Sequence, residues 1–169
     1  MRKVIPFAIK NPATFKEKLL LWAQQYENVA FLDSNGYPGN NKAKFAYSSY
    51  DCIAAIGKIS ELMPSNGNSF DKLHEFAVKQ YDWLFGYFSY ELKNEIEKLS
   101  SKNPDFTGFP EMHFFRPRYI FLISEGNVKI AYFPEISDID DIIQTFIQIN
   151  NTALNDQNLD FAINMQQRI

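Results

Sequence analysis

Two apolar stretches separated by a two-residue turn constrain the fold of this chain more than any other feature. Residues 114–124 and 127–133 are rich in aromatic and β-branched side chains, and Glu125-Gly126 stands between them. A two-residue loop with a glycine that can adopt a positive φ is typical of a tight hairpin. We therefore expect an antiparallel pair of strands here.

Other segments predict further strands. Residues 83–89 are almost wholly apolar, which predicts a strand buried on both faces. Pro6 lies inside another extended segment and is expected near a sheet edge or a bulge. For residues 51–59 an extended path is expected, with a helix as the alternative. The strands expected outside the hairpin are 2–9, 29–33, 45–50, 51–59 and 83–89.

Helix signals alternate with these strands. Asn11 followed by Pro12 is a helix start, and Thr14 with Glu17 is an alternative capping box. Ser69 is expected to cap a helix that runs to about Tyr81, a short helix is expected over 92–99, and Ser137 is expected to cap the last one. The apolar residues expected to face inward are Phe15, Leu19, Trp22, Ala23 and Tyr26; Phe70, Leu73, Phe76, Ala77 and Tyr81; and Ile139, Ile142, Ile143, Phe146 and Ile149. Antiparallel strands with flanking helices predict an α+β fold.

Composition restricts the class of protein. A chain of 169 residues suits one domain, and its net charge of −3 argues against nucleic acid as a partner. No apolar stretch approaches the roughly 20 residues of a membrane span, so no membrane association is expected. The single Cys52 cannot form an internal disulfide, which favours a cytoplasmic location.

The residues alone predict no active site. His74 and His113 lack neighbours at metal-ligand spacing, and Cys52 is expected to be a buried, inert thiol. Glu91 and Glu95 share a helix face, where paired carboxylates could perform acid–base chemistry, although a solvated charged face explains them better. Helix capping accounts for the acidic cluster Asp138, Asp140 and Asp141. We expect no catalytic residue and no metal ligand in this chain.

Three segments, in the expected order, resemble the amino-terminal region of the chorismate-using synthases. Residues 30–34, Ala-Phe-Leu-Asp-Ser, are similar to the "LLES" segment of anthranilate synthase large subunits. Residues 86–92, Gly-Tyr-Phe-Ser-Tyr-Glu-Leu, resemble the "GYxxYDL" signature of the same family. Residues 110–119 are similar to the family's Pro-aromatic entry into a central hairpin.

The resemblance implies a fold and a domain organisation. It implies the amino-terminal half of the chorismate-synthase four-layer fold, with an α+β domain over residues 1–158. Residues 159–169 alternate like a strand and are expected to lead toward a carboxyl-terminal chorismate-binding domain that this chain does not contain. Tyr87 and Tyr90 are expected to pack on that other half, or alternatively on the core of this domain.

The resemblance also implies a function for the parent enzyme. It looks most like aminodeoxychorismate synthase component I, the para-aminobenzoate synthase of folate biosynthesis. That enzyme adds ammonia to chorismate with Mg²⁺, the ammonia coming from a glutamine amidotransferase subunit. The catalytic residues and the Mg²⁺ ligands belong to the other half, so this chain is expected to be inactive alone and to hold no cofactor. The alternatives are an anthranilate synthase component I fragment, a stand-alone amino-acid-binding regulatory module, or a structural interaction domain.

A ligand pocket is the one site that the resemblance places on this chain. In the family the "LLES" strand lines a pocket that takes tryptophan, which here implies Leu32, Asp33 and Ser34. Asp33 replaces the family's glutamate; its carboxylate could fix a ligand's ammonium group. The alternative is a simple turn in which Asp33 binds backbone N–H groups. Gly86 is expected to permit close packing of two backbones.

Overall fold

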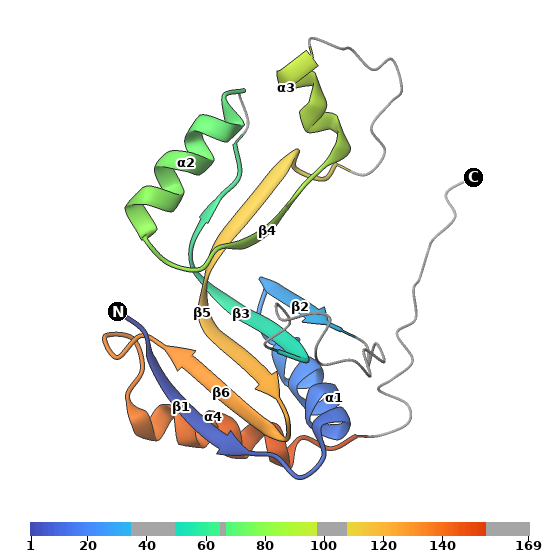
Figure 1. The fold of residues 1–169 in the computed structure, drawn as a ribbon, viewed down its shortest axis with the longest axis vertical. Helices are drawn as coiled ribbons and strands as arrows, with labels where there is room; N and C mark the ends of the chain where they lie inside the picture. The colour runs from blue at the N-terminus through green and yellow to red at the C-terminus, as the bar shows by residue number, and fades with distance from the viewer. Residues whose placement is uncertain (35–49, 65–66, 98–107, 155–169) are drawn as a thin grey trace, which may run out of the picture.

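The computed structural model describes residues 1–34, 50–64, 67–97 and 108–154, and these residues form an α+β fold (Figure 1). Six antiparallel strands and four α-helices lie within them, as expected from the sequence. The elements are β1 (Lys3–Ala8), α1 (Pro12–Ala23), β2 (Val29–Asp33), β3 (Cys52–Leu62), α2 (Ser69–Gln80), β4 (Phe85–Phe88), the 3₁₀ turn η1 (Tyr90–Leu92), α3 (Lys93–Glu97), β5 (Met112–Ser124), β6 (Asn127–Tyr132) and α4 (Ile139–Asn151).

The predicted hairpin is confirmed and forms the middle of the sheet. The strand order is β1-β6-β5-β3-β2, and β4 pairs separately with β5. Glu125 and Gly126 both have positive φ, 47° and 76°, which matches the right-handed twist of the strands they join. β1 is an edge strand, so Pro6 removes no hydrogen bond from an interior ladder. β3 is a strand throughout its length, and the helical alternative for residues 51–59 is wrong.

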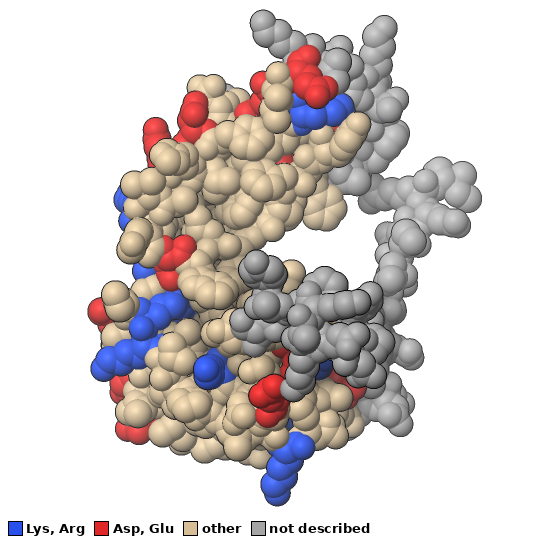
Figure 2. All heavy atoms as spheres, in the orientation of Figure 1, with Lys and Arg blue, Asp and Glu red and all other residues tan. Residues whose placement is uncertain are grey.

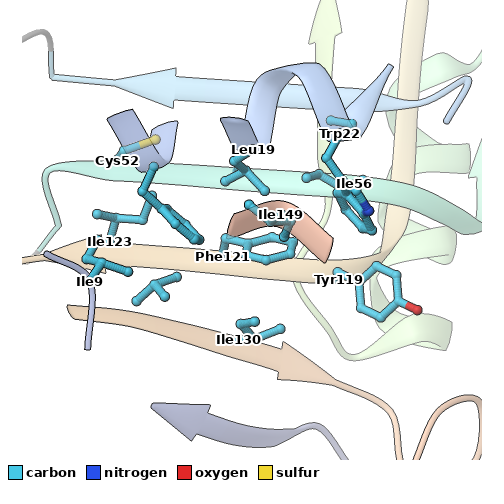
Figure 3. Packing of buried hydrophobic residues seen from close by; sticks show 14 of the residues in the cluster. Ile9, Leu19, Trp22, Cys52, Ile56, Tyr119, Phe121, Ile123, Ile130 and Ile149 are labelled. Atoms are coloured by element: carbon cyan, nitrogen blue, oxygen red, sulfur yellow. The ribbon is translucent and has the colours of Figure 1, made fainter. Parts of the chain in front are cut away.

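One face of the sheet is covered by α1 and α4 (Figure 3). The side chain of Asn11 caps α1 by accepting from the Thr14 backbone N–H at 3.2 Å. Phe146 of α4 stacks on Phe7 of β1 with 4.2 Å between ring centroids. The predicted inner face of α1 is confirmed for its four buried members, Phe15, Leu19, Trp22 and Ala23, and Tyr26 packs against them.

A second, smaller cluster of buried side chains lies apart from this core. Its members are Ala55, Phe85, Phe115, Ile120, Leu122 and Ala131, with Ala30, Tyr50 and Ile53 packed against them. Ala55 alternates along β3 with Ala54 and Ile56 of the helix-covered core, so this cluster occupies the opposite face of the sheet there. α1 and α4 therefore cover only one face.

Two predicted helix caps are wrong by one residue. Asn68, with φ of 55°, precedes α2, while Ser69 is its first helical residue. Asp138 caps α4 and forms a capping box with Asp141, while the buried Ser137 precedes the helix. Asp138 makes a side-chain cap hydrogen bond, whereas Asn68 makes none. Both serine hydroxyls bond elsewhere.

The predicted inner faces of α2 and α4 are wrong in part. Tyr81 follows α2 with φ of 45° and is almost wholly exposed, because the chain turns away there. Phe70 is 44% exposed. In α4 the buried residues are Ile142, Thr145 and Ile149, while Ile139 is 55% exposed. The side of α4 that faces the sheet is thus rotated toward Thr145.

The prediction that residues 83–89 are buried on both faces is wrong. Only Phe85 is buried in β4, and Phe88 is 51% exposed. β4 pairs with a single strand, β5, and part of its aromatic surface stays open to solvent. The strand expected over 45–50, except for its last residue Tyr50, and the strand-like residues 159–169 lie outside the described residues. The proposed domain limits therefore stay a prediction.

Candidate functional site

The three residues predicted to line a ligand pocket lie at the carboxyl end of β2. Leu32 and Asp33 are its last two residues, paired with Ile53 and Cys52 of β3. Ser34 follows the strand, and its backbone N–H donates to the Asp51 carbonyl at 2.9 Å. All three residues are exposed. The end of β2 is therefore accessible from solvent.

Leu32 and Asp33 point to opposite faces of the sheet. Side chains alternate along a strand, and Phe31 packs on the core beneath α1 while Ala30 packs on the second cluster. Asp33 shares the face of Phe31 and accepts a hydrogen bond from Lys16 of α1 at 2.7 Å. Leu32, 57% exposed, shares the other face with Ala30. One ligand could not meet both side chains on the same surface of β2.

Gly86 allows β4 to approach β5 closely, as the sequence predicted. A Cβ atom at position 86 would lie 2.6 Å from the Phe114 Cα and would overlap the His113 carbonyl oxygen. Gly86 pairs with Phe114 in the ladder. Two of the three segments that carry the family resemblance, 86–92 and 110–119, are therefore in direct contact.

Aromatic side chains around β4 remain open to solvent. The ring centroids of Tyr87 and Phe109 lie 6.4 Å apart, and those of Phe88 and Phe70 of α2 lie 5.9 Å apart. Tyr90 is 80% exposed, so it does not pack into the core of this domain. Figure 2 shows that the part of the molecule carrying α2 and β4 has a mostly uncharged surface, with acidic side chains at its margin. The exposed large apolar residues in this part are Met63, Phe70, Val78, Tyr81, Trp83, Tyr87, Phe88, Tyr90, Ile96 and Phe109.

Neither Cys52 nor the pair Glu91 and Glu95 is arranged as a nucleophile or a general base. Cys52 is buried, as predicted. Burial, followed by the charge of Asp33, raises the pKa of its thiol to about 12, which favours the less reactive protonated form. Glu95 is not part of a solvated face. It accepts from both the backbone N–H and the hydroxyl of Ser69, at 2.9 and 2.6 Å. Glu91 instead pairs with Lys93 at 3.5 Å.

His113 takes part in a polar cluster that the sequence did not predict. Its Nε2 lies 3.2 Å from Glu61 Oε2 and 3.3 Å from Asn28 Nδ2. Lys58 donates to Glu61 at 2.6 Å, and this bond is the main cause of the lowered pKa of Glu61. Burial opposes the shift, and His113 adds to it. These residues come from three distant segments, which is why no spacing rule could find them. His74 is exposed, as predicted.

The described residues offer no evident metal-binding site. No group of three or more His, Cys, Asp or Glu side chains within them is arranged to hold a metal ion. The Mg²⁺ that the family resemblance implies is thus not matched by a ligand set in this part of the chain. Among the helices that the structure describes, none has the length and apolar character needed to cross a membrane.

Comparison with known proteins adds no family assignment. No protein-family model matches the chain, and no curated protein matches it.

Proposed function

We propose that this chain is a non-catalytic amino-terminal domain of a chorismate-aminating synthase, most similar to aminodeoxychorismate synthase component I. The observation that supports the proposal is the placement of the three family-like segments in one sheet. β4 pairs with β5, and Ala30 of β2 packs on the same cluster as Phe115 of β5. An anthranilate synthase component I fragment is the alternative within the same family.

The proposal assigns a scaffolding role to the open aromatic surface around β4. Monomeric proteins rarely expose large contiguous apolar patches, and such patches commonly mark interaction sites. Tyr87, Phe88 and Tyr90 belong to the "GYxxYDL"-like segment and are all exposed. We propose that they pack on a chorismate-binding domain, which would supply the Mg²⁺ site and accept ammonia from a glutamine amidotransferase subunit. We also propose a cytoplasmic location.

Reconstitution tests the proposal. The purified chain alone, given chorismate, ammonia and Mg²⁺, is expected to form no aminodeoxychorismate. Adding the chorismate-binding domain encoded in the same genome is expected to raise amination above the level of that domain alone. A Tyr87→Glu, Phe88→Glu variant should lose this increase in amination. The matched variant Ile139→Glu, at an exposed position of α4, should keep it. Turnover by the chain alone would refute the non-catalytic role.

A tryptophan site at the end of β2 is part of the same proposal. Because Leu32 and Asp33 lie on opposite faces, the ligand would have to reach around the edge strand β2. Its indole ring would contact Leu32 on the open face, and its ammonium group would replace Lys16 at Asp33. Calorimetric titration with tryptophan tests this: Leu32→Glu should abolish the binding heat, and Lys16→Met should strengthen binding by removing a cation that competes for the carboxylate. No heat with the unmodified chain would remove this site and leave the scaffolding role standing. Binding together with failed reconstitution would favour a stand-alone amino-acid-binding module.

A further inference from the structure

A cavity lies at the amino end of β2, at the opposite end of the strand from Leu32–Ser34. Its volume is about 340 Å³. Its wall consists of one carboxylate, two cations and four uncharged residues: Glu27, Lys58, Arg118, Gln25, Tyr26, Asn28 and Gly57. This is near the lower end of the range of small-molecule pockets. The residues come from the segment before β2, from β3 and from β5, so only the folded sheet brings them together.

Glycine at position 57 shapes this cavity. Gly57 has φ of 69°, and its N–H donates to the Asn28 carbonyl at 2.9 Å. A Cβ atom there would lie 3.0 Å from the Tyr26 ring and 3.3 Å from the Arg118 Cβ. The register between β3 and β5 shifts between Lys58 and Ser60. Bulges of this kind redirect side chains and are frequent beside functional sites.

Arg118 brings an uncompensated charge to the cavity. Within the described residues its guanidinium makes no ion pair with a carboxylate; its Nη2 donates to Ser137 Oγ at 3.3 Å, and its buried Nε has no acceptor. A partly buried cation without a counter-charge is costly. The other cation on the wall, Lys58, is already paired with Glu61 at 2.6 Å and with Glu27 at 3.4 Å.

Asn28 supplies a second unpartnered polar group on the same wall. The residue is only 8% exposed, and its Oδ1 has no hydrogen-bond partner, although its Nδ2 contacts His113. Buried side-chain amides are normally satisfied at both ends. A buried cation and a buried amide, each incompletely satisfied beside the same cavity, call for a ligand with both negative charge and hydrogen-bonding capacity.

We propose that this cavity binds a small organic carboxylate that carries a hydroxyl or amino group. The carboxylate accepts from Arg118, which lines the cavity, and the substituent bonds to the amide of Asn28. Besides its long hydrogen bond to Ser137, the Arg118 guanidinium contacts the ring of Tyr119, at 5.2 Å from the centroid. Arg118 is suited to this role because its planar donors match a carboxylate. The site is independent of the proposed synthase function.

Titration by NMR tests this site, with L-lactate and L-alanine as probes and lactamide as the uncharged control. Saturable shifts are expected at the backbone amides of Tyr26, Asn28 and Gly57 for at least one of the two carboxylates, and none for lactamide. Arg118→Met should weaken binding by about tenfold or more, because the charged hydrogen bonds are lost. Lys129→Met, which removes an exposed cation from β6, should leave affinity unchanged.

A second variant keeps the test informative if the first one misfolds. If Arg118→Met disturbs the spectrum of the free protein, Asn28→Asp keeps the side-chain size and is expected to weaken the binding of L-lactate by about tenfold through repulsion of its carboxylate. Equal shifts with lactamide, unchanged affinity in the Arg118 and Asn28 variants, or no shift with either carboxylate would overturn the proposal. A response to inorganic phosphate alone would also overturn the assigned ligand class.

Discussion

At the scale of single residues, Gly86 shows how one missing side chain determines the position of a strand. The backbone of β5 occupies the space that any Cβ atom at position 86 would need. β4 can pair with β5 at Phe114 only because glycine has no Cβ atom to occupy this space. The aromatic residues that flank Gly86 depend on this pairing for their place on the surface.

Gly86→Ala is expected to lower the free energy of unfolding by about 2–3 kcal/mol, since the clash is with backbone atoms that cannot move aside. Urea denaturation followed by tryptophan fluorescence measures the loss. Gly67→Ala is the matched control: Gly67 has φ of 69°, but a Cβ atom there would meet no other atom within 4 Å, so only backbone strain of about 1 kcal/mol is expected. An equal loss in both variants would contradict the close-packing account.

Asp82 is the second residue on which the arrangement depends. Arg2 of the amino terminus and Arg116 of β5 both donate to its carboxylate at 2.9 Å, and both guanidiniums lie 4.2 Å from the centroid of the Phe133 ring. Burial alone would raise the pKa of Asp82, but the hydrogen bonds from Arg2 and Arg116 outweigh it and lower the pKa below its ordinary value. The network joins the segment before β4 to the main sheet.

Stability should therefore fall in acid. A carboxylate whose pKa is lower in the folded state stabilises the protein above its unfolded pKa, and this contribution is lost as the pH falls below about 4 and through the folded value. Asp82→Asn should lose about 3 kcal/mol at pH 7, because the buried guanidinium of Arg2 and the partly buried one of Arg116 lose their counter-charge. Urea denaturation between pH 7 and pH 3 measures both effects. If Asp82→Asn kept the full acid dependence of the unmodified protein, the assignment to Asp82 would be wrong.

At the scale of elements, α2 is held at its first turn by α3. Glu95 accepts two hydrogen bonds from Ser69, which places a carboxylate at the positive end of the α2 dipole. The charged helix that follows β4 thus stabilises the helix that precedes it. The exposed aromatic residues of α2 and β4 are kept together by this link.

Glu95→Ala is expected to cost about 1–2 kcal/mol of stability and to increase hydrogen exchange in the first turn of α2, since a cap is lost. Glu97→Ala is the control on the same helix, because Glu97 is exposed. Exchange measured by mass spectrometry distinguishes the two variants. Unchanged protection of residues 69–72 in Glu95→Ala would contradict the link between α2 and α3.

Local signals predicted most elements, and long-range contacts account for the errors. The hairpin turn, the Asn11 cap and β2 depend on neighbouring residues and were predicted correctly. The burial of β4 was predicted wrongly, because an apolar run looks the same whether it is covered or open. The Asn28–His113–Glu61 cluster could not be predicted, because its members are up to 85 residues apart. Because side chains alternate along a strand, the sequence alone places Leu32 and Asp33 on opposite faces of β2. The predicted pocket, which uses both side chains, neglects this alternation.

At the scale of the whole molecule, the sheet has one face covered by α1 and α4 and a second side with an open aromatic surface. Figure 2 shows a hollow between the part that carries β4 and the main body. The proposed scaffold uses this side for its partner domain. The carboxylate cavity at Arg118 is a separate site at the other end of β2.

Hydrogen exchange on a mixture of this chain with the chorismate-binding domain tests the scaffold most directly. The account predicts a complex in which residues 83–90 and 109 gain protection while the outer surface of α4 does not. It also predicts that Tyr87→Glu, Phe88→Glu removes the protection. Failure to form a complex, or protection confined to α4, would contradict the assignment of this chain as the non-catalytic half of a synthase.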